Sequence, residues 1–362
     1  MIFNDAFKNK KVVITGNTGF KGSWLSQWLV QLGAKVYGIS KDIPTFPSLF
    51  ESLNLKDKIS HNTIDIRNYT VLNNKIKEIA PDYVFHLAAQ AIVSESYTNP
   101  LDTYSSNVMG TANVLEALKN IDNDCVTIVV TSDKCYDNVE WQWGYRETDA
   151  IGGKDIYSGS KGAAELVFKS FYNSFFLKTH TNIKLASARA GNVIGGGDWA
   201  KERIVPDCFR AWNLKQPVSL RQPMATRPWQ FVLEPLSGYL LLAIKLQKDQ
   251  KLNGESYNFG PFSHNNQSVL DLLKDLSKYW DFNDFEPFNI NKKTLYNEAG
   301  LLKLNCDKAL LDLKWTPTLN YDELIEFTGT WYRDFYGESN KIDAKTIEQI
   351  IKYQSLANQR SI

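Results

Sequence analysis

The sequence predicts an α/β fold built on a doubly wound parallel sheet, accompanied by a smaller mixed α/β region. Through the first half of the chain, short and continuously apolar runs of strand length alternate with longer runs of helical periodicity. Such strands are buried on both faces, and their alternation with helices implies right-handed crossovers between parallel strands. After the glycine cluster at 195–197 the segments become shorter, more aromatic and richer in proline. We therefore expect one domain over residues 1–190 and a second over 191–362, with room for chain crossings between the two.

The expected elements follow one another in order. Residues 11–15 (KVVIT) form an apolar run, and apolar residues from Trp24 to Leu32 then recur at helical spacing. Further strands are expected over 35–39, 62–66, 83–88, 126–131 and 183–189, with helices over 71–79, 101–118 and 160–176. Pro81 closes the first of these three helices, because proline cannot continue a helical hydrogen-bond ladder. In the second region, helices are expected over 235–247, 268–279 and 321–336, followed by a terminal helix after Gly337.

Charge and cysteine content argue against several classes of protein. The 362 residues carry 41 Lys and Arg against 40 Asp and Glu, which gives a net charge of +1. A chain built around nucleic acid or an anionic membrane would show a basic excess, so neither partner is expected. The four cysteines and four histidines have no metal-ligand spacing, so no metal site is expected. The N-terminus lacks the apolar core of a signal peptide and no apolar run is long enough to span a membrane, which predicts a cytoplasmic protein.

Residues 16–22 (GNTGFKG) directly follow the first expected strand and open the first expected helix. The glycines are spaced G-x-x-G-x-x-G, and a turn without Cβ atoms lets the backbone approach a pyrophosphate. The helix N-terminus then offers unpaired N–H groups and the positive end of its dipole to that anion. This strand–turn–helix context predicts a Rossmann-type dinucleotide site. Its expected cofactor contacts are Gly16, Thr18, Gly19, Phe20, Lys21 and Gly22.

The ends of the next strands bear on which dinucleotide is bound. An acidic residue after the second strand binds the ribose 2′-hydroxyl of NAD, whereas a basic residue can pair with the 2′-phosphate of NADP. Lys41 and Asp42 stand there together, so NAD is expected and NADP stays open. His86, inside an apolar strand, is interpreted as a packed core residue rather than a catalyst. Besides Asp42, the expected cofactor contacts after the third and fourth strands are Asp65, Ile66, Leu87, Ala88 and Ala89.

A tyrosine and a lysine four residues apart, Tyr157 and Lys161, follow the fifth expected strand. If a helix begins here, both side chains project from one face. A lysine ammonium close to a phenol favours the phenolate and lowers the tyrosine pKa from about 10, which gives a base usable near neutral pH. Such a pair is common by chance, but its place in a chain with a dinucleotide loop makes it a candidate catalytic pair that also contacts the cofactor.

The fifth strand ends in residues 131–136 (TSDKCY), which place a hydroxyl, a carboxylate and an amine in succession. The carboxyl ends of strands are where ligands bind in an open α/β sheet. A polar strand end can also be a plain loop, but this position favours function. Ser132, Asp133 and Lys134 are therefore candidate catalytic residues.

With these residues the chain resembles the nucleotide-sugar 4,6-dehydratases of the extended short-chain dehydrogenase/reductase superfamily, and most closely their CDP-glucose branch. The matching stretches are GNTGFKGSWLSQWL at 16–29, TSDKCYDNVEWQWGYRETD at 131–149, YSGSKGAAELV at 157–167 and ARAGNVIGGGDW at 188–199. Many related dehydratases have Asp-Glu where this chain has Asp133 and Lys134, and the Asp-Lys form is similar to the CDP-glucose branch. The resemblance covers nearly the whole chain and is thinnest in the last hundred residues.

The resemblance implies an internal redox cycle on bound NAD that yields a 4-keto-6-deoxy sugar nucleotide without net oxidation. Tyr157, assisted by Lys161, would take the proton of the 4-hydroxyl as hydride leaves carbon 4, and hydride would later return at carbon 6. Ser132 would hydrogen-bond the 4-oxygen, and Asp133 would protonate the departing 6-hydroxyl. The base for carbon 5 stays open. Lys134 stands where related enzymes have glutamate, so it must either be neutral or act electrostatically while another group takes the proton.

The resemblance also bears on substrate and assembly. It places Asn192 beside the sugar diphosphate, and arginine forks suit the binding of phosphate oxygens. The expected sugar-nucleotide contacts are Asn192, Arg203, Arg221 and Arg227, which assigns the second region mainly to the sugar nucleotide. Related enzymes pair the helices that match 101–118 and 160–176 across a two-fold axis, so a homodimer is expected.

Three alternatives stay open beside a CDP-glucose 4,6-dehydratase. The first is a 4,6-dehydratase of another hexose or amino-sugar nucleotide, because base recognition lies in the less legible second region. The second is a nucleotide-sugar epimerase or reductase, against which Asp133 and Lys134 count. The third is a non-catalytic dinucleotide sensor, which the loss of Tyr157 or of the glycine loop would signal, and both are intact.

Overall fold

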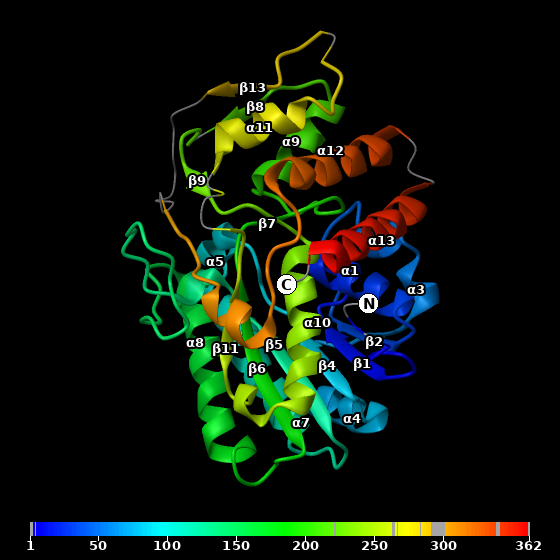
Figure 1. Ribbon diagram of the computed structural model, residues 1–362, viewed down its shortest axis with the longest axis vertical. Coiled ribbons are helices and arrows are strands. Elements are labelled where there is room, and N and C mark those ends of the chain that lie inside the picture. Colours follow the sequence, from blue (N-terminus) through cyan, green and yellow to red (C-terminus); the bar gives the residue numbers. More distant parts are fainter. Residues whose placement is uncertain are drawn as a thin grey trace.

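A seven-stranded parallel sheet forms the centre of the molecule (Figure 1). The computed structural model describes residue 3 and residues 5–220, 222–262, 265, 267–282, 284–290, 301–337 and 341–360. The strand order is β11-β6-β5-β4-β1-β2-β3, and each neighbouring pair is parallel. The strands are β1 (Lys11–Thr15), β2 (Lys35–Ser40), β3 (Ser60–Thr63), β4 (Tyr83–His86), β5 (Cys125–Val130), β6 (Ile183–Ala190) and β11 (Ser256–Phe259). The expected doubly wound fold is confirmed, and the strand order reverses between β1 and β4.

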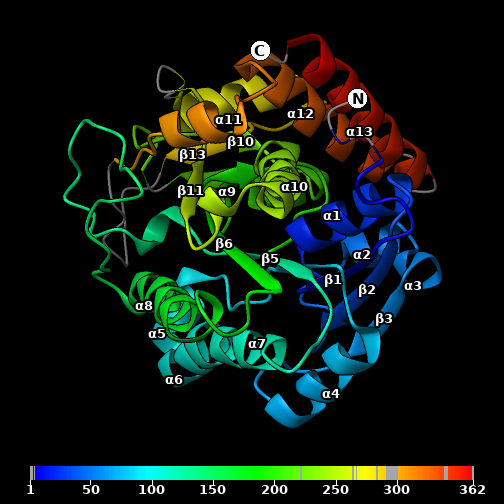
Figure 2. The same ribbon diagram turned by 60° about the horizontal axis from the view of Figure 1, so that its bottom comes forward.

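Helices cover both faces of this sheet, as Figure 2 shows. One face carries α1 (Phe20–Gln31) and α10 (Leu233–Lys248), and the other carries α4 (Tyr69–Ile79), α7 (Gly110–Leu118) and α8 (Ile156–Phe171). Val12 and Ile14 of β1 pack in the core with α1 and α10, whereas Val13 packs in the core with α4 and α7. Because successive strand residues face opposite sides of a sheet, a strand covered on both sides needs an unbroken apolar run.

One strand of the sheet and one of the helices that cover it come from the second half of the chain. β11 pairs in parallel with β6, and α10 packs over β5 and β6. Residues 256–259 of the second region therefore complete the sheet of the first region. The C-terminal helix α13 (Ile342–Arg360) packs against α1, where the rings of Trp28 and Tyr353 lie 5.7 Å apart. Both ends of the chain thus return to the same face of the sheet.

Three helices differ from those that the apolar periodicity predicted: two begin earlier, and one is divided into shorter segments. α1 begins at Phe20, in the glycine loop itself. α8 begins at Ile156 rather than at residue 160, because Asp155 caps it by accepting the N–H of Ser158 at 2.9 Å. The expected helix over 101–118 consists of α6 (Pro100–Tyr104), a π-helical turn η1 (Ser105–Met109) and α7. Since α8 starts early, Tyr157 and Lys161 both lie on it.

The remaining elements build the second region, at the top of Figure 1. Its helices are α9 (Ile204–Asn213), α11 (Val269–Ser277) and α12 (Tyr321–Gly337). Three short ladders join β7 (Val193–Ile194) to β10 (Gln230–Phe231), β8 (Val218–Leu220) to β13 (Phe288–Ile290), and β9 (Thr226–Arg227) to β12 (Gln267–Ser268). The aromatic side chains of this region mainly pack on one another; the rings of Phe209 and Tyr332, for example, stack 4.2 Å apart.

Short helical segments connect these elements. They are α2 (Leu49–Ser52), α3 (Leu55–Lys58), α5 (Val93–Thr98), η2 (Asp133–Cys135), η3 (Tyr172–Phe176), η4 (Gln250–Leu252) and η5 (Ala309–Leu313). No helix in the described part of the chain is both long and apolar enough to cross a membrane. Within the same residues there is no cluster of three or more His, Cys, Asp or Glu side chains that could hold a metal ion.

Candidate active site

The glycine loop is packed so closely, backbone against backbone, that Gly16 and Gly22 have no room for a side chain. Gly16 has a φ of +78°, and a Cβ there would be 2.8 Å from the backbone nitrogen of Ala88. A Cβ on Gly22 would be 2.0 Å from the carbonyl oxygen of Gly16. Gly19 is the N-cap of α1 and provides no side-chain cap, so the first N–H groups of the helix stay available to an anion. These residues fit the cofactor predicted from the loop.

The two acidic residues expected to contact the adenosine half of the cofactor, Asp42 and Asp65, lie in different surroundings. Thr18 donates through its Oγ1 to the carbonyl oxygen of Asp42 at 2.7 Å, which ties the loop to the end of β2. The Asp42 carboxylate is exposed and lies 3.8 Å from the Lys41 ammonium. Asp65 is bound by the guanidinium of Arg67, whose hydrogen bonds lower the pKa of that carboxyl. Asp42 is therefore open to a ribose, whereas Asp65 already has a partner within the chain.

Two of the expected contacts, Leu87 and Ala88, lie against the glycine loop, whereas Ile66 packs elsewhere. The backbone of Leu87 and Ala88 lies directly under Gly16, with Ala88 N donating to Thr15 Oγ1 at 3.2 Å, and Ala89 follows at the same strand end. The Ile66 side chain is instead buried against Gly110 of α7, where a Cβ would meet it at 2.4 Å. Ile66 thus fills the core, and any cofactor contact it makes must be through its backbone.

His86 is a packed core residue, as its apolar strand suggested. Its Nδ1 lies 2.7 Å from Thr15 Oγ1 and its Nε2 lies 3.0 Å from Thr111 Oγ1. Burial, with the nearby charge of Lys161, lowers the pKa of His86 to about 3. The imidazole is therefore neutral at physiological pH and holds β1, β4 and α7 together.

Tyr157 and Lys161 lie one turn apart on α8, with the lysine Nζ 5.9 Å from the centroid of the tyrosine ring. Lys161 does not lower the tyrosine pKa as expected: burial raises the pKa of Tyr157 to about 12. The charge of Arg203 and a hydrogen bond with Ser132 oppose this effect. Burial also lowers the pKa of Lys161 to about 8. The expectation was wrong because it counted charge and omitted desolvation, which is the larger effect here.

The end of β5 places a buried carboxylate beside this pair. Ser132 caps η2, accepting the N–H of Lys134 at 3.2 Å and donating to Asp133 Oδ1 at 2.9 Å. Asp133 is 3% exposed, and its carboxylate occupies space left free by Gly191. Lys134 is only partly buried, and its side chain has no hydrogen bond or ion pair with another described residue. The three consecutive residues therefore differ sharply in their surroundings.

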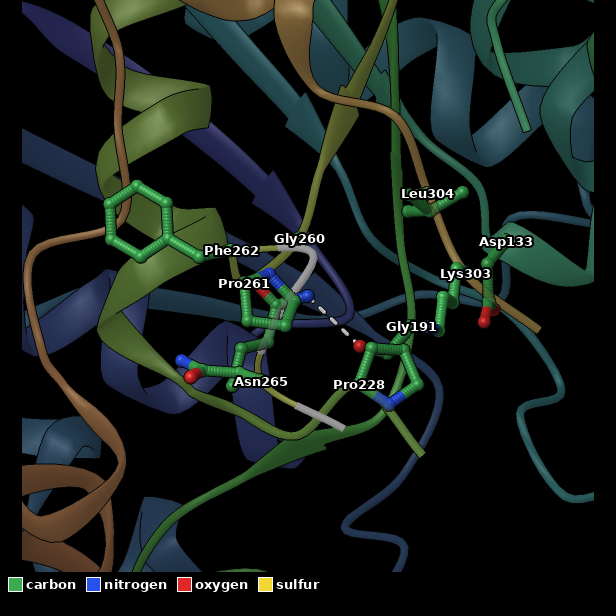
Figure 3. A pocket seen from close by; sticks show the side chains of 10 residues that line it. Asp133, Gly191, Pro228, Gly260, Pro261, Phe262, Asn265, Lys303 and Leu304 are labelled. Carbon is green, nitrogen blue, oxygen red and sulfur yellow. Dashed lines mark hydrogen bonds between the residues drawn. The ribbon is translucent and has the colours of Figure 1, made fainter. Parts of the chain in front are cut away.

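Asp133 forms one wall of a small cavity at the carboxyl ends of β5, β6 and β11 (Figure 3). Gln230 lines this cavity and donates through Nε2 to the carbonyl oxygens of Gly191 at 2.9 Å and Phe259 at 3.0 Å. The lining residues are Asp133, Gly191, Pro228, Gln230, Gly260, Pro261, Phe262, Asn265, Lys303 and Leu304. Segments from both regions of the chain thus meet at the candidate general acid.

Three of the four residues expected to bind the sugar nucleotide lie in the described part of the chain, on different segments. Arg203, at the start of α9, donates to Asp198 Oδ2 at 2.8 Å and lies near enough to Tyr157 to act on its charge. Asn192 has a φ of +51°, and its carbonyl oxygen accepts the N–H of Gln230 at 3.2 Å. Arg227 is partly buried in β9 and donates to the carbonyl oxygen of its neighbour Thr226 at 2.9 Å. The fourth expected contact, Arg221, lies outside the described residues.

Sequence reasoning missed two features of the site. One is a buried ion pair, in which Arg189 and Glu165 meet at 2.8 Å with side chains 3% and 1% exposed. The other is Tyr239 on α10, whose ring lies 5.9 Å from the Lys21 Nζ. Neither could be found by local motifs, because the partners are distant in sequence. Lys21 was expected to contact the cofactor, and its Nζ lies over the ring of Tyr239.

The fold is the Rossmann-like fold of the short-chain dehydrogenase/reductase type, and it carries a Tyr–Lys pair and a buried carboxylate at the carboxyl edge of the sheet. The family described as GDP-mannose 4,6 dehydratase matches residues 13–328. The chain belongs to this family of nucleotide-sugar dehydratases, so the resemblance drawn from its motifs is confirmed.

Individual relatives agree with this assignment. CDP-glucose 4,6-dehydratase of Salmonella typhimurium is 44% identical over 359 residues, which cover 98% of this chain and 99% of that protein. dTDP-glucose 4,6-dehydratase of Haemophilus influenzae is 22% identical, over 89% of this chain and 97% of that protein. Among solved structures, dTDP-glucose 4,6-dehydratase of Bacillus anthracis in complex with NAD has a TM-score of 0.73 at 19% identity, covering 90% and 97% of the two chains. UDP-glucose 4-epimerase of Thermotoga maritima has a TM-score of 0.76 at 20% identity, covering 90% and 99%.

Proposed function

We propose that this chain catalyses the 4,6-dehydration of CDP-glucose to CDP-4-keto-6-deoxyglucose. The observation that carries the proposal is the 44% identity to the Salmonella enzyme over nearly the full length of both chains. The relative named for dTDP-glucose is half as similar, at 22% identity, which favours a cytidine nucleotide. The pair Asp133–Lys134 at the end of β5 agrees with that branch and argues against an epimerase.

NAD is the proposed cofactor. The glycine loop and the open N-terminus of α1 would hold its pyrophosphate, and the exposed Asp42 carboxylate would bind the ribose 2′-hydroxyl. Lys41 is the residue that could pair with the 2′-phosphate of NADP, but its ammonium lies 3.8 Å from the Asp42 carboxylate. When bound, the nicotinamide supplies the acceptor for hydride from carbon 4 and the donor of hydride to carbon 6. NAD in the Bacillus anthracis dehydratase structure supports this choice.

Four residues of this chain would perform the proton transfers at carbons 4 and 6. Tyr157 takes the proton of the 4-hydroxyl, which near neutral pH requires positive charge to favour the phenolate. Lys161 assists from the next turn of α8, and Ser132 hydrogen-bonds the 4-oxygen. Asp133, buried at the cavity wall, protonates the departing 6-hydroxyl so that it leaves as water. The proton gained at Tyr157 balances the one lost at Asp133, so the site returns to its starting state through solvent.

Arginines and one backbone turn would hold the sugar nucleotide. Arg203 is close enough to Tyr157 for their charges to interact, and Asp198 orients it, which suits a contact with the diphosphate beside the sugar. Asn192 stands at the turn between β6 and β7, close to the cavity behind Asp133. The remaining proposed contacts are Arg227, which lies in β9, and Arg221, which follows β8 in the sequence.

A homodimer in the cytoplasm is the proposed working form. The helices expected to pair across a two-fold axis carry large exposed apolar side chains, with Leu101 82%, Met109 56% and Leu166 60% exposed. These residues belong to α6, η1 and α8, which pack against one another. Large exposed apolar side chains on neighbouring helices are typical of an interface. Light scattering tests it: Leu101→Asp with Leu166→Asp should convert a dimer to a monomer, and a monomeric wild type would refute it.

The substrate proposal is tested by offering the purified protein, loaded with NAD, each of CDP-glucose, dTDP-glucose, UDP-glucose and GDP-mannose. A 4-keto-6-deoxy product develops absorbance in alkali, and only CDP-glucose should give it rapidly. Preference for another nucleotide would overturn the cytidine assignment. Epimerised sugar without water loss would indicate an epimerase, and no change in any substrate would indicate a dinucleotide sensor.

A further inference from the structure

The Asp133 turn, residues 132–135, is held at both ends by one buried ion pair. Just before the turn, Thr131 Oγ1 donates to the Glu165 carboxylate. Just after it, the Tyr136 hydroxyl accepts a hydrogen bond from Arg189 Nη1 at 2.8 Å. Arg189 and Glu165 are themselves joined at 2.8 Å, and both side chains are buried. The two ends of the turn are therefore fixed relative to each other through this pair.

The Tyr136 hydroxyl has two partners in the interior. Besides accepting from Arg189, it donates to Asn258 Oδ1 on β11 at 2.8 Å. Asn258 is held in turn, because its Nδ2 donates to the carbonyl oxygens of Tyr145 at 2.9 Å and Asn305 at 3.1 Å. Tyr136 is 1% exposed, and its ring stacks on that of Tyr145 with the centroids 5.1 Å apart. Segments that are distant in sequence thus fix both the ring and the hydroxyl.

The strand end at β6 contacts this turn through two residues that are two positions apart. Arg189 holds the Tyr136 hydroxyl, and Gly191 leaves the space that the Asp133 carboxylate occupies. The Tyr136 N–H donates to the carbonyl oxygen of Asp133 at 3.4 Å, which closes the single turn of η2. A displacement of Tyr136 is therefore transmitted to Asp133 through one turn of backbone.

We propose that Tyr136 is a positioning residue that fixes Asp133 for protonation of the departing 6-hydroxyl; this inference rests on the dehydration proposed above. Tyr136 gives no proton to the substrate, because its hydroxyl proton is donated to Asn258. Its effect is geometric: the Asp133 carboxyl must be within hydrogen-bond reach of the 6-oxygen as the bond from carbon 6 to oxygen breaks. A displacement of about 1 Å can slow such a step about 100-fold.

The two chemical steps depend on different parts of the site, which makes this role measurable. Tyr157 and Lys161, which would act at carbon 4, lie on α8. Ser132, the residue of the turn that would act at carbon 4, lies at the end that Thr131 anchors. Loss of the Tyr136 hydroxyl should therefore slow the loss of water and leave oxidation of carbon 4 almost unchanged.

Tyr136→Phe removes only the hydroxyl, and Tyr353→Phe is the matched control. Tyr353 on α13 is also buried, and its hydroxyl lies 2.8 Å from the Glu234 carboxylate and 3.0 Å from Ser237 Oγ on α10. Each protein is loaded with NAD and mixed with CDP-glucose for a single turnover. Reduced nicotinamide, followed by its near-ultraviolet absorbance, appears as carbon 4 is oxidised and disappears once water has been lost and hydride has returned to carbon 6.

The ratio of these two rates decides the proposal. In Tyr136→Phe, reduced nicotinamide should appear within about threefold of the wild-type rate and disappear about 10–100-fold more slowly. In Tyr353→Phe, both rates should stay within about threefold of wild type. A loss of folded protein alone lowers the signal but leaves the ratio unchanged. If Tyr136→Phe keeps the wild-type ratio, whether its two rates are normal or equally slow, the positioning role is refuted.

A second variant covers a failure of Tyr136→Phe to fold, which urea denaturation of each protein detects. Asn258→Ala then takes its place, because it removes the acceptor of the Tyr136 hydroxyl and keeps the tyrosine ring. The same ratio is measured. Slow disappearance of reduced nicotinamide after normal appearance supports the positioning role, and a wild-type ratio refutes it.

The wild-type reaction is measured first, so that the two proposals fail separately. If the wild type dehydrates no sugar nucleotide, the proposed function is wrong and the positioning role falls with it. If the wild type forms product while Tyr136→Phe keeps the wild-type ratio, the proposed function stands and only the role of Tyr136 is refuted.

Discussion

Gly191 leaves the space that the Asp133 carboxylate fills: a Cβ at residue 191 would lie 1.9 Å from Asp133 Oδ2. The contact joins the end of β6 to the turn after β5, at the wall of the cavity in Figure 3. A residue without any chemistry of its own therefore fixes where the candidate general acid lies.

Gly191→Ala should slow dehydration about as strongly as Asp133→Asn, by roughly 10²–10⁴-fold, because the displaced carboxylate no longer reaches the leaving hydroxyl. Oxidation at carbon 4 should survive in both variants and be visible as reduced nicotinamide. Gly260→Ala is the matched control, since a Cβ there finds only ordinary contacts, the nearest being Cys306 Sγ at 3.5 Å. Normal turnover of Asp133→Asn would show that Asp133 is not the acid, and normal turnover of Gly191→Ala alone would show that the space at Gly191 does not fix its position.

Gly22→Ala should abolish NAD binding, measured by quenching of tryptophan fluorescence. The new Cβ would be 2.0 Å from the Gly16 carbonyl oxygen, and backbone cannot yield there without opening the loop. Gly337→Ala, with nothing within 4 Å of the added atom, should bind NAD like the wild type. A Gly22→Ala protein that still binds NAD with native affinity would remove the loop from the cofactor site.

His86 should make the fold less stable in mild acid. Its pKa is about 3 when folded and about 6.5 when unfolded, so the unfolded state takes up the proton first. The contribution of the neutral His86 imidazole to the free energy of unfolding is complete above pH 6.5. It is lost as the pH falls toward 3, at up to about 1.4 kcal/mol per pH unit. Urea unfolding at pH 7.5, 6.0 and 5.0 measures it. His86→Gln should show a correspondingly flatter profile, and an unchanged slope would contradict the buried neutral imidazole.

Glu165→Gln should cost about 3–5 kcal/mol of unfolding free energy, because it leaves the buried guanidinium of Arg189 without its charged partner. Glu326→Gln is the control: its pair with Lys352 has the same 2.8 Å separation, but both side chains are nearly half exposed, so about 0–1 kcal/mol is expected. Urea denaturation of the three proteins compares them. Equal losses in the two variants would mean that burial does not govern these pairs.

Local pattern was sufficient for most of the fold. The apolar run at β1, the helical spacing from Trp24 to Leu32 and the alternation that follows are properties of neighbouring residues, and they predict the parallel sheet correctly. The pairing of β11 with β6 was not predicted, because it joins segments about seventy residues apart and each reads simply as a strand. The early start of α8 depends on a cap at Asp155, outside the apolar pattern.

The same division holds for the candidate site. Tyr157 and Lys161, or Ser132 and Asp133, are close in sequence, so spacing places them together. The direction of the Lys21 side chain and the space beside Asp133 depend on chain segments that meet only in the folded protein. Desolvation, which raises the pKa of Tyr157, likewise depends on how many distant residues cover the ring.

The return of the chain to β11 and α10 has a consequence during synthesis. A growing polypeptide that ends near residue 190 has already emerged with β1 to β6, yet it lacks the strand that borders β6 and the helix that covers β5 and β6. Such a nascent chain exposes an unpaired strand edge and a bare apolar surface, the features that invite aggregation. We therefore expect the first region to fold only after translation has passed residue 259. Fragments that end at residue 190 should depend on chaperones.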